Sequence, residues 1–427
     1  MPGSQPASAH MSVWQYTQLI NVFCFVKRCS LSSQSPAAQA AAPSYPAGHW
    51  TAFTDPRLFE PLPLSDSLDD ALQTLVSSDQ RPRRQAPQRS DFKPQVHSYE
   101  SLNQYVGSKQ WRALALASQA SIEALSLDHT INRGASGGVL KYWVYRILAL
   151  AQLGQGGIVR VEVGRLERVE SGGMRRWPFE LRLLRAQAPG MLGEWAVVCD
   201  RLSSLLRGCQ RALLPPAPPA SSDDSRALWE HRVRRISLLL VGCAMRMGDP
   251  GLATGILGAV AGWGLQSAGA DPRLLSAIAR VHLQLGSVPE AERLFLQVER
   301  QVPGDRMVHM NRALFSVAMG KWESARDSFA AVVDGRPEEA VAAANNLALC
   351  QLYLGSPQLM LQSLQQLMVA APAAAGTAEE LVFNYCSGLD LQYDGARLRE
   401  AKIKKIVDVA TWAGDAFDMG SFKIQNN

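Results

Sequence analysis

A helix-turn-helix pattern that recurs about every 34 residues constrains the fold of this 427-residue chain more than any other feature. It occupies residues 271–372 in three copies. In each copy a glycine separates two apolar stripes, and a proline follows the second stripe. The second stripe has large apolar residues, and in two copies it also has a small residue. The recurring residues are Gly286, Ala291, Phe295 and Pro303, then Gly320, Trp322, Ala325, Phe329 and Pro337, then Gly355, Leu364 and Pro372.

Apolar residues in these copies are spaced three and four apart, so each helix has one apolar stripe that a single hairpin cannot bury. Ala291 and Ala325 let paired helices approach closely, and Phe295 and Phe329 fill the space between neighbouring pairs. The glycines tolerate left-handed backbone angles at the end of each first helix, and the prolines stop each second helix. A period near 34 is typical of tetratricopeptide (TPR) repeats. We therefore predict an all-α protein, a right-handed α-solenoid of TPR-like helical hairpins.

Residues 1–95 are predicted to be a mostly disordered arm, because Pro, Ser, Ala and Gln dominate and no helical period is sustained. A short motif at residues 50–76 interrupts it: the aromatic-rich TAFTDPRLFEP, then an amphipathic helix with Leu68 and Leu72. Such a motif either folds on binding a partner or packs on the chain's own helices. Both interpretations stay open at this stage.

The remaining chain is predicted to be helical. Residues 96–260 have a two-helix rhythm without a clean period, which indicates degenerate hairpin repeats with a Pro-rich insertion at 213–225. Residues 373–427 are expected to form a terminal helical pair and a tail that frays or caps the stack. Asp271 is placed to cap a helix, and Ser287 with Glu290 and Thr377 with Glu380 have capping-box spacing.

No catalytic, cofactor or metal site is predicted, so an enzyme is disfavoured. Gly255, Gly258 and Gly262 have the wrong spacing for a phosphate-binding loop. Seven scattered cysteines without a CxxC pair indicate reduced thiols of a cytoplasmic protein. A net charge of +5 does not indicate a nucleic-acid partner. The apolar run Leu19–Val26 precedes Lys27 rather than following a basic segment, an order that is wrong for a secretory signal.

Two asparagines are candidates for a peptide-binding groove. Asn311 and Asn346 stand two residues before a small residue of a predicted first helix, a position similar to the groove asparagines of peptide-binding TPR domains. Met307 occupies the place where a clamp for a terminal carboxylate has a basic residue, so such a clamp is disfavoured. A basic helix at residues 397–405 is either a solvated face or a contact with an acidic membrane or partner.

Several stretches resemble a known family. They are TDPRLF in the arm, LLSAIARVHLQLGSVPEAERLFLQVE, MNRALFSVAMGKWESARDSF, AVAAANNLALCQLYLG and ELVFNYCSGLDLQYDG in the helical part, and a closing Gly414-Asp-Ala-Phe. Together they are similar to the subunit 12 family of the transport protein particle (TRAPP) tethering complex, most specifically from Leu274 to Tyr393.

The resemblance implies a non-catalytic scaffold subunit of a TRAPP III-type assembly, which supports activation of a Rab GTPase in endoplasmic reticulum to Golgi transport and autophagy. It implies the peripheral TRAPP III subunits 8, 11 and 13 as partners, indirect association with a Rab GTPase and vesicle membranes, and no cofactor. A soluble TPR adaptor or co-chaperone that binds an extended peptide is the alternative.

Overall fold

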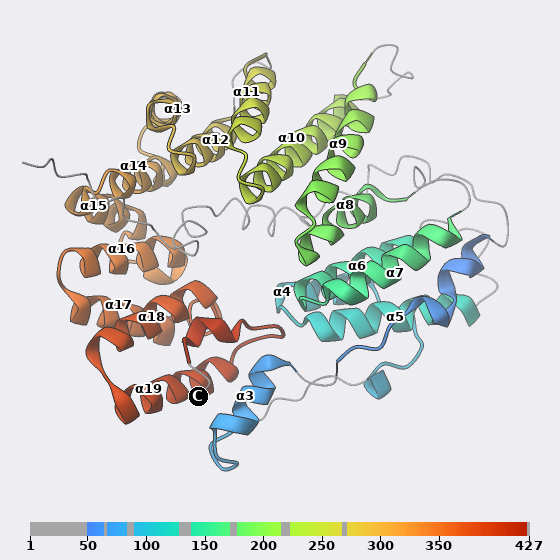
Figure 1. Ribbon diagram of the computed structural model, residues 1–427, viewed down its shortest axis with the longest axis horizontal. Helices are drawn as coiled ribbons and strands as arrows, with labels where there is room; N and C mark the ends of the chain where they lie inside the picture. Colours follow the sequence, from blue (N-terminus) through green and yellow to red (C-terminus); the bar gives the residue numbers. More distant parts are fainter. Residues whose placement is uncertain are drawn as a thin grey trace, which may run out of the picture. The chain divides into compact units, whose positions relative to one another are not determined.

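The structure is a computed structural model that describes residues 49–63, 66–82, 89–127, 138–170, 177–214, 223–266 and 271–424. Within these ranges the regular elements are α-helices and short 3-10 turns, without a strand (Figure 1). The predicted all-α class and helical solenoid architecture are confirmed. Residues 1–48 of the arm and most of the insertion at 213–225 lie outside the described residues.

The helices group into two compact units. We call Leu257–Asp394 the repeat unit, and Pro36–Ile256 with Gly395–Asn427 the N-terminal unit. The first division falls inside helix α11 (Pro250–Gln266), and the second precedes the last helix. The expected boundary near residue 373 therefore differs from the observed one, because the two helices of the expected terminal pair belong to different units.

The repeat unit is a series of hairpins in which first and second helices alternate. Its elements are α12 (Pro272–Gln284), α13 (Val288–Gln301), α14 (Arg306–Ala318), α15 (Trp322–Val333), η7 (Pro337–Glu339), α16 (Val341–Tyr353), α17 (Pro357–Ala370) and α18 (Glu379–Gln392). Helix α12 packs on α13 and also on α14, so consecutive first helices touch. Gly286, Gly320 and Gly355 have φ angles of 76°, 69° and 81°, the left-handed conformation that ends each first helix.

Only one of the three expected side-chain caps forms. Asp271 accepts a hydrogen bond from the backbone N–H of Arg273 at 2.9 Å, as expected for a helix that begins with Asp-Pro. Ser287 makes no capping hydrogen bond with its side chain. The Thr377 hydroxyl instead donates to the carbonyl of Ala373 at 2.7 Å. Both predicted capping boxes are wrong, since spacing alone does not orient the hydroxyl toward the helix start.

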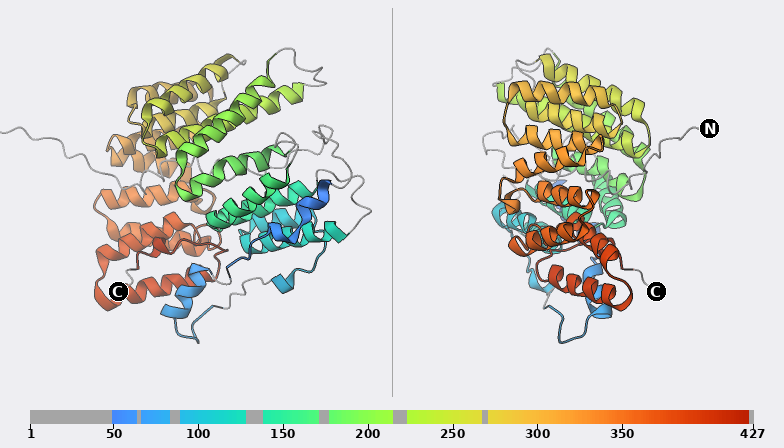
Figure 2. Two further views of the ribbon diagram at one scale, coloured as in Figure 1. Left: turned by 45° about the vertical axis from the view of Figure 1, so that its right-hand side comes forward. Right: turned by 90° about the vertical axis from the view of Figure 1, so that its left-hand side faces the viewer.

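The N-terminal unit contains the described part of the arm, the irregular hairpins and the last helix. Its elements are η1 (His49–Thr54), η2 (Pro56–Leu58), α3 (Ser67–Leu75), η3 (Arg89–Asp91), α4 (Tyr99–Gly107), α5 (Trp111–Leu127), α6 (Gly138–Gln152), α7 (Gly156–Val169), α8 (Phe179–Gln187), η6 (Ala188–Leu192), α9 (Trp195–Arg211), α10 (Asp223–Arg246), the start of α11, α19 (Gly395–Ala410) and η8 (Met419–Phe422). Helix α19 contacts α3, and the two lie side by side in both views of Figure 2.

Candidate functional site

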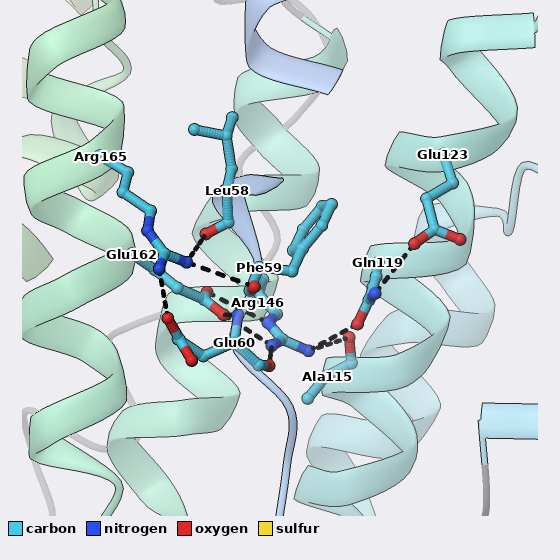
Figure 3. Close-up of polar contacts among 9 residues, drawn as sticks. All are labelled: Leu58, Phe59, Glu60, Ala115, Gln119, Glu123, Arg146, Glu162 and Arg165. Carbon is cyan, nitrogen blue, oxygen red and sulfur yellow. Dashed lines mark hydrogen bonds and ion pairs between the residues drawn. The ribbon is translucent and has the colours of Figure 1, made fainter. Parts of the chain in front are cut away.

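A segment of the arm lies in a cradle formed by α5, α6 and α7 (Figure 3). Phe53 is fully buried and Leu58 is nearly so. The ring of Phe59 stacks on Trp143 with centroids 4.7 Å apart, and the Trp143 indole Nε1 donates to the carbonyl of Phe53 at 2.9 Å. Of the two interpretations of the motif, packing on the chain's own helices is the one observed. We call residues 53–63 the arm segment.

The polar centre of the cradle is a fully buried ion pair between Arg146 of α6 and Glu162 of α7. The guanidinium donates to Glu162 at 2.7 and 3.2 Å, to the Gln119 side chain at 3.2 Å and to the carbonyl of Glu60 at 2.9 Å. The backbone N–H of Glu60 donates to Glu162 Oε1 at 2.9 Å. The cradle thus satisfies both main-chain groups of Glu60, as a neighbouring strand would.

Two further arginines hold the main chain on either side of Glu60. Arg165 donates to the carbonyls of Leu58 at 3.4 Å and Phe59 at 3.3 Å, and it forms an ion pair with the Glu60 side chain. Arg112 of α5 donates to the carbonyl of Pro63. These contacts are made with main-chain groups, so the chemistry of the cradle is that of holding a protein segment.

The closing Gly-Asp-Ala-Phe also belongs to the N-terminal unit. Asp415 Oδ2 accepts from the backbone N–H of Arg112 at 2.6 Å, which places a carboxylate at the start of α5. A Cβ on Gly414 would lie 2.6 Å from the carbonyl oxygen of Lys109, so only glycine fits there. The carbonyl of Phe417 accepts from the Ser67 hydroxyl at 3.3 Å. The tail was expected to fray or to cap the stack; it caps α5 instead.

The repeat-packing residues predicted from the sequence lie mostly inside the repeat unit. Ala291, Ala325, Phe329 and Leu364 have no more than traces of exposed surface. Phe295 packs edge-on against Phe315 of the next repeat at 6.4 Å, and Trp322 stacks on Tyr353 at 3.9 Å. The prolines follow the second helices: Pro303, Pro337 and Pro372 come after α13, α15 and α17.

Asn311 links two first helices. Its side chain is 2% exposed. Its Oδ1, on α14, accepts hydrogen bonds from two residues of α12: from the Ser276 hydroxyl at 2.8 Å and from Arg280 Nε and Nη2 at 3.0 and 2.9 Å. The predicted groove residue therefore acts within the repeat unit, with its carbonyl oxygen already occupied. Arg280 was missed from the sequence because a single arginine in an amphipathic helix gives no signal of its own.

A second link of this kind joins α16 to α18, where Asn384 Nδ2 donates to Asn345 Oδ1 at 3.0 Å. Asn346 is half-buried. In the two linked pairs, Ser276 and Asn345 lie on the first helix that precedes the linked asparagine. Met310 occupies the equivalent position before Asn346, and its thioether is at best a weak hydrogen-bond acceptor. The sequence pattern marked both asparagines alike and did not show that Asn311 has partners within the repeat unit.

Burial lowers the pKa of Arg280 to about 10, because the guanidinium loses contact with water. Among the described residues no carboxylate pairs with it: its hydrogen bonds go to the Asn311 amide. His282 on the same helix also has a pKa lowered by burial. Helix α12 thus has a cation whose charge the described part of the fold leaves uncompensated.

Three basic residues of the helix at residues 397–405 are exposed, namely Arg397, Arg399 and Lys404, whereas the other two are buried. Lys402 and Lys405 are each 5% exposed. Lys402 Nζ donates to the carbonyl of Lys423 at 2.9 Å, and Lys405 pairs with Asp408 at 3.2 Å.

In the described part of the chain, no helix is long and apolar enough to cross a bilayer, and no group of three His, Cys, Asp or Glu side chains is placed to hold a metal ion.

The fold and these contacts define a protein of the TPR-like helical-repeat class, in which a cradle of helices holds a segment of the same chain. No protein-family model matches the chain. The Mus musculus protein named Trafficking protein particle complex subunit 12 is 28% identical over 265 residues, which are 58% of this chain and 32% of the mouse protein. The Homo sapiens protein of the same name is 27% identical over 265 residues, 58% of this chain and 35% of the human protein. The resemblance is confirmed: over 265 residues the chain is similar to subunit 12 of this complex.

The chain spans about a third of the length of the curated relatives it matches. Among solved structures, the human IFIT1 dimer with m7Gppp-AAAA matches with 14% identity and a TM-score of 0.35, covering 80% of this chain and 86% of that one. A likeness of this size carries no conclusion about function.

Proposed function

We propose that the chain is a non-catalytic scaffold subunit of a TRAPP III-type vesicle-tethering complex that supports Rab activation in endoplasmic reticulum to Golgi transport and autophagy. The observation that carries this proposal is the homology to subunit 12 of the trafficking protein particle complex. Stacked hairpins support it, because each adds surface without adding a reactive centre. The partners proposed are the peripheral subunits 8, 11 and 13, with the chain in the cytoplasm on the surface of endoplasmic reticulum and Golgi membranes.

Affinity purification of the tagged full chain under mild lysis, followed by mass spectrometry, tests this function. We expect TRAPP subunits to be recovered with the chain and to be absent from a purification with the tag alone. Recovery of no TRAPP subunit would refute the proposal. Exchange belongs to other subunits in this proposal, so the purified chain alone is expected to leave the rate of nucleotide release from a Rab GTPase unchanged.

The alternative is a soluble TPR adaptor or co-chaperone that binds an extended peptide. The observation that favours it is the partly exposed Arg280 on a first helix, where peptide-binding TPR domains contact their ligands. The same purification separates the two functions, because an adaptor is expected to recover chaperones or diverse clients without the TRAPP subunits.

A further inference from the structure

Charge is segregated between the first and second helices of two consecutive repeats. Helices α12 and α14 contain no Asp or Glu, whereas α13 and α15 contain all the acidic residues of these hairpin helices. The basic residues of the two first helices are Arg273, Arg280, Arg306 and Arg312. The face formed by α12 and α14, which we call the first-helix face, therefore has no acidic residue within its two helices, and Asp271 and Asp305 cap their N-termini.

The pairing of these arginines singles out Arg280. Arg312 forms an ion pair with Glu299 of α13, and Arg306 lies 3.9 Å from Glu339. Arg280 gives Nε and Nη2 to the neutral amide oxygen of Asn311, and no described residue accepts a hydrogen bond from its Nη1. A partly buried cation without a counter-ion is unfavourable for folding, so its retention points to a partner outside the chain.

Two more polar groups beside Arg280 lack partners among the described residues. They are Nδ2 of Asn311, on a side chain that is 2% exposed, and both side-chain atoms of Gln284. Gln284 follows Arg280 by four positions, so the two side chains share one face of α12. Buried amide groups are nearly always hydrogen-bonded in folded proteins. This cluster therefore has unused donors around an unpaired positive charge, which is the chemistry of a carboxylate site.

We propose that the first-helix face binds an acidic segment of a partner protein, in which a side-chain carboxylate pairs with Arg280. Residues 1–54 cannot supply this group, because they contain no Asp or Glu. Arg273 is exposed and lies seven positions before Arg280, about 10 Å along the helix. Two carboxylates about three residues apart in an extended segment span a similar distance, so the face matches a run of acidic side chains better than one terminal carboxylate.

This inference goes beyond the scaffold function, because it names the chemistry of one attachment. Fluorescence anisotropy with the full-length chain tests it. The probe is a labelled nine-residue peptide of Gly, Ser and Leu with two Glu three residues apart, acetylated and amidated at its ends. The comparison peptides replace both Glu by Gln, or leave the carboxyl terminus free.

We expect saturable binding of the Glu peptide, no binding of the Gln peptide, and binding weakened about tenfold or more by Arg280→Gln. The matched control is Arg293→Gln, which removes an exposed arginine of α13 that pairs with Glu290 and is expected to bind like the unmodified chain. Equal binding by Arg280→Gln, no binding of the capped Glu peptide, or binding only with a free carboxyl terminus would each overturn the inference.

The melting temperature of Arg280→Gln separates a binding role from a structural one. Removing an uncompensated, partly buried charge is expected to leave the melting temperature unchanged or to raise it, while peptide binding is lost. A lower melting temperature with unchanged peptide affinity would make Arg280 a structural residue and overturn the inference. If the chain does not bind the peptide while the tagged chain still recovers TRAPP subunits, the acidic-segment site is refuted and the scaffold function is retained.

Discussion

Two arginines, one fully buried and one partly buried, show how the environment of a residue decides its role. In the N-terminal unit, Arg146 is surrounded by Glu162, Gln119 and a carbonyl of the arm segment, so its charge is paired and its donors are used. In the repeat unit, Arg280 has only the Asn311 amide. The first arginine completes a folded core. The second leaves a site that another molecule can complete.

At Arg146 the expected effect of removing the partner is large. Glu162→Ala leaves a fully buried guanidinium without its carboxylate and the N–H of Glu60 without its acceptor. The cost expected for breaking such a pair is about 3–5 kcal/mol. Hydrogen exchange of the backbone amides of α6 and α7 measures it as a lower opening free energy, together with exposure of the arm segment.

The control for this variant is Glu290→Ala, which breaks an ion pair whose side chains are 57% and 42% exposed. Water and salt screen such a pair, so the change expected in hydrogen exchange is below about 1 kcal/mol. If Glu162→Ala lowered protection in α6 and α7 no more than this control lowers protection in α13, the arm segment would not depend on the buried pair.

At the scale of the helices, the turns show which connections could be predicted from the sequence and which could not. Gly154 and Gly248 in the N-terminal unit both have φ angles of 71°, in the same left-handed region as the repeat glycines. The turn between α4 and α5 uses Lys109 at a φ angle of 56°, which no sequence rule marks, because lysine rarely adopts that conformation. The regular repeats were predictable because their signals are local and periodic. For the irregular hairpins, only the alternation of paired helices could be predicted.

The contacts of the cradle could not be predicted, because they join residues that are far apart in the sequence. Glu60 and Arg146 are 86 residues apart, and neither belongs to a pattern that names the other. The amphipathic motif was visible, but whether it packs on its own chain depends on an arginine and a glutamate in helices of ordinary composition. The same holds for Asn311, whose position was identified but whose partner, Arg280, was not.

The close approach of paired helices gives a prediction at this scale. Ala325 of α15 is fully buried, in a repeat whose two helices pack closely. Ala325→Trp is expected to destabilise the repeat unit by about 1–3 kcal/mol, because an indole must displace packed neighbours. Thermal unfolding measures the change. Ala330→Trp, on the exposed side of the same helix, is the control and is expected to have little effect. An unchanged midpoint for Ala325→Trp would refute the packing role of Ala325.

At the scale of the chain, residues far apart in sequence complete the N-terminal unit. Arg112 and Asp415 are separated by 303 positions, and Ser67 and Phe417 by 350. Since the closing segment supplies the carboxylate at the start of α5, this unit gains these contacts only after residues 415–417 have been synthesised. The repeat unit has no such requirement, because its hairpins contact sequence neighbours.

Gly414→Ala tests this long-range closure. The new methyl group would lie 2.6 Å from the Lys109 carbonyl oxygen, and backbone on both sides leaves little room to adjust. We expect the closing segment to detach, so that hydrogen exchange rises in residues 411–424 and at the start of α5, while α12–α17 keep their protection. Gly164→Ala is the control, because nothing lies within 4 Å of the added atom. In α7 the added alanine favours helix by up to about 1 kcal/mol. Equal protection of α5 in both variants would show that the closing segment contributes nothing to the N-terminal unit.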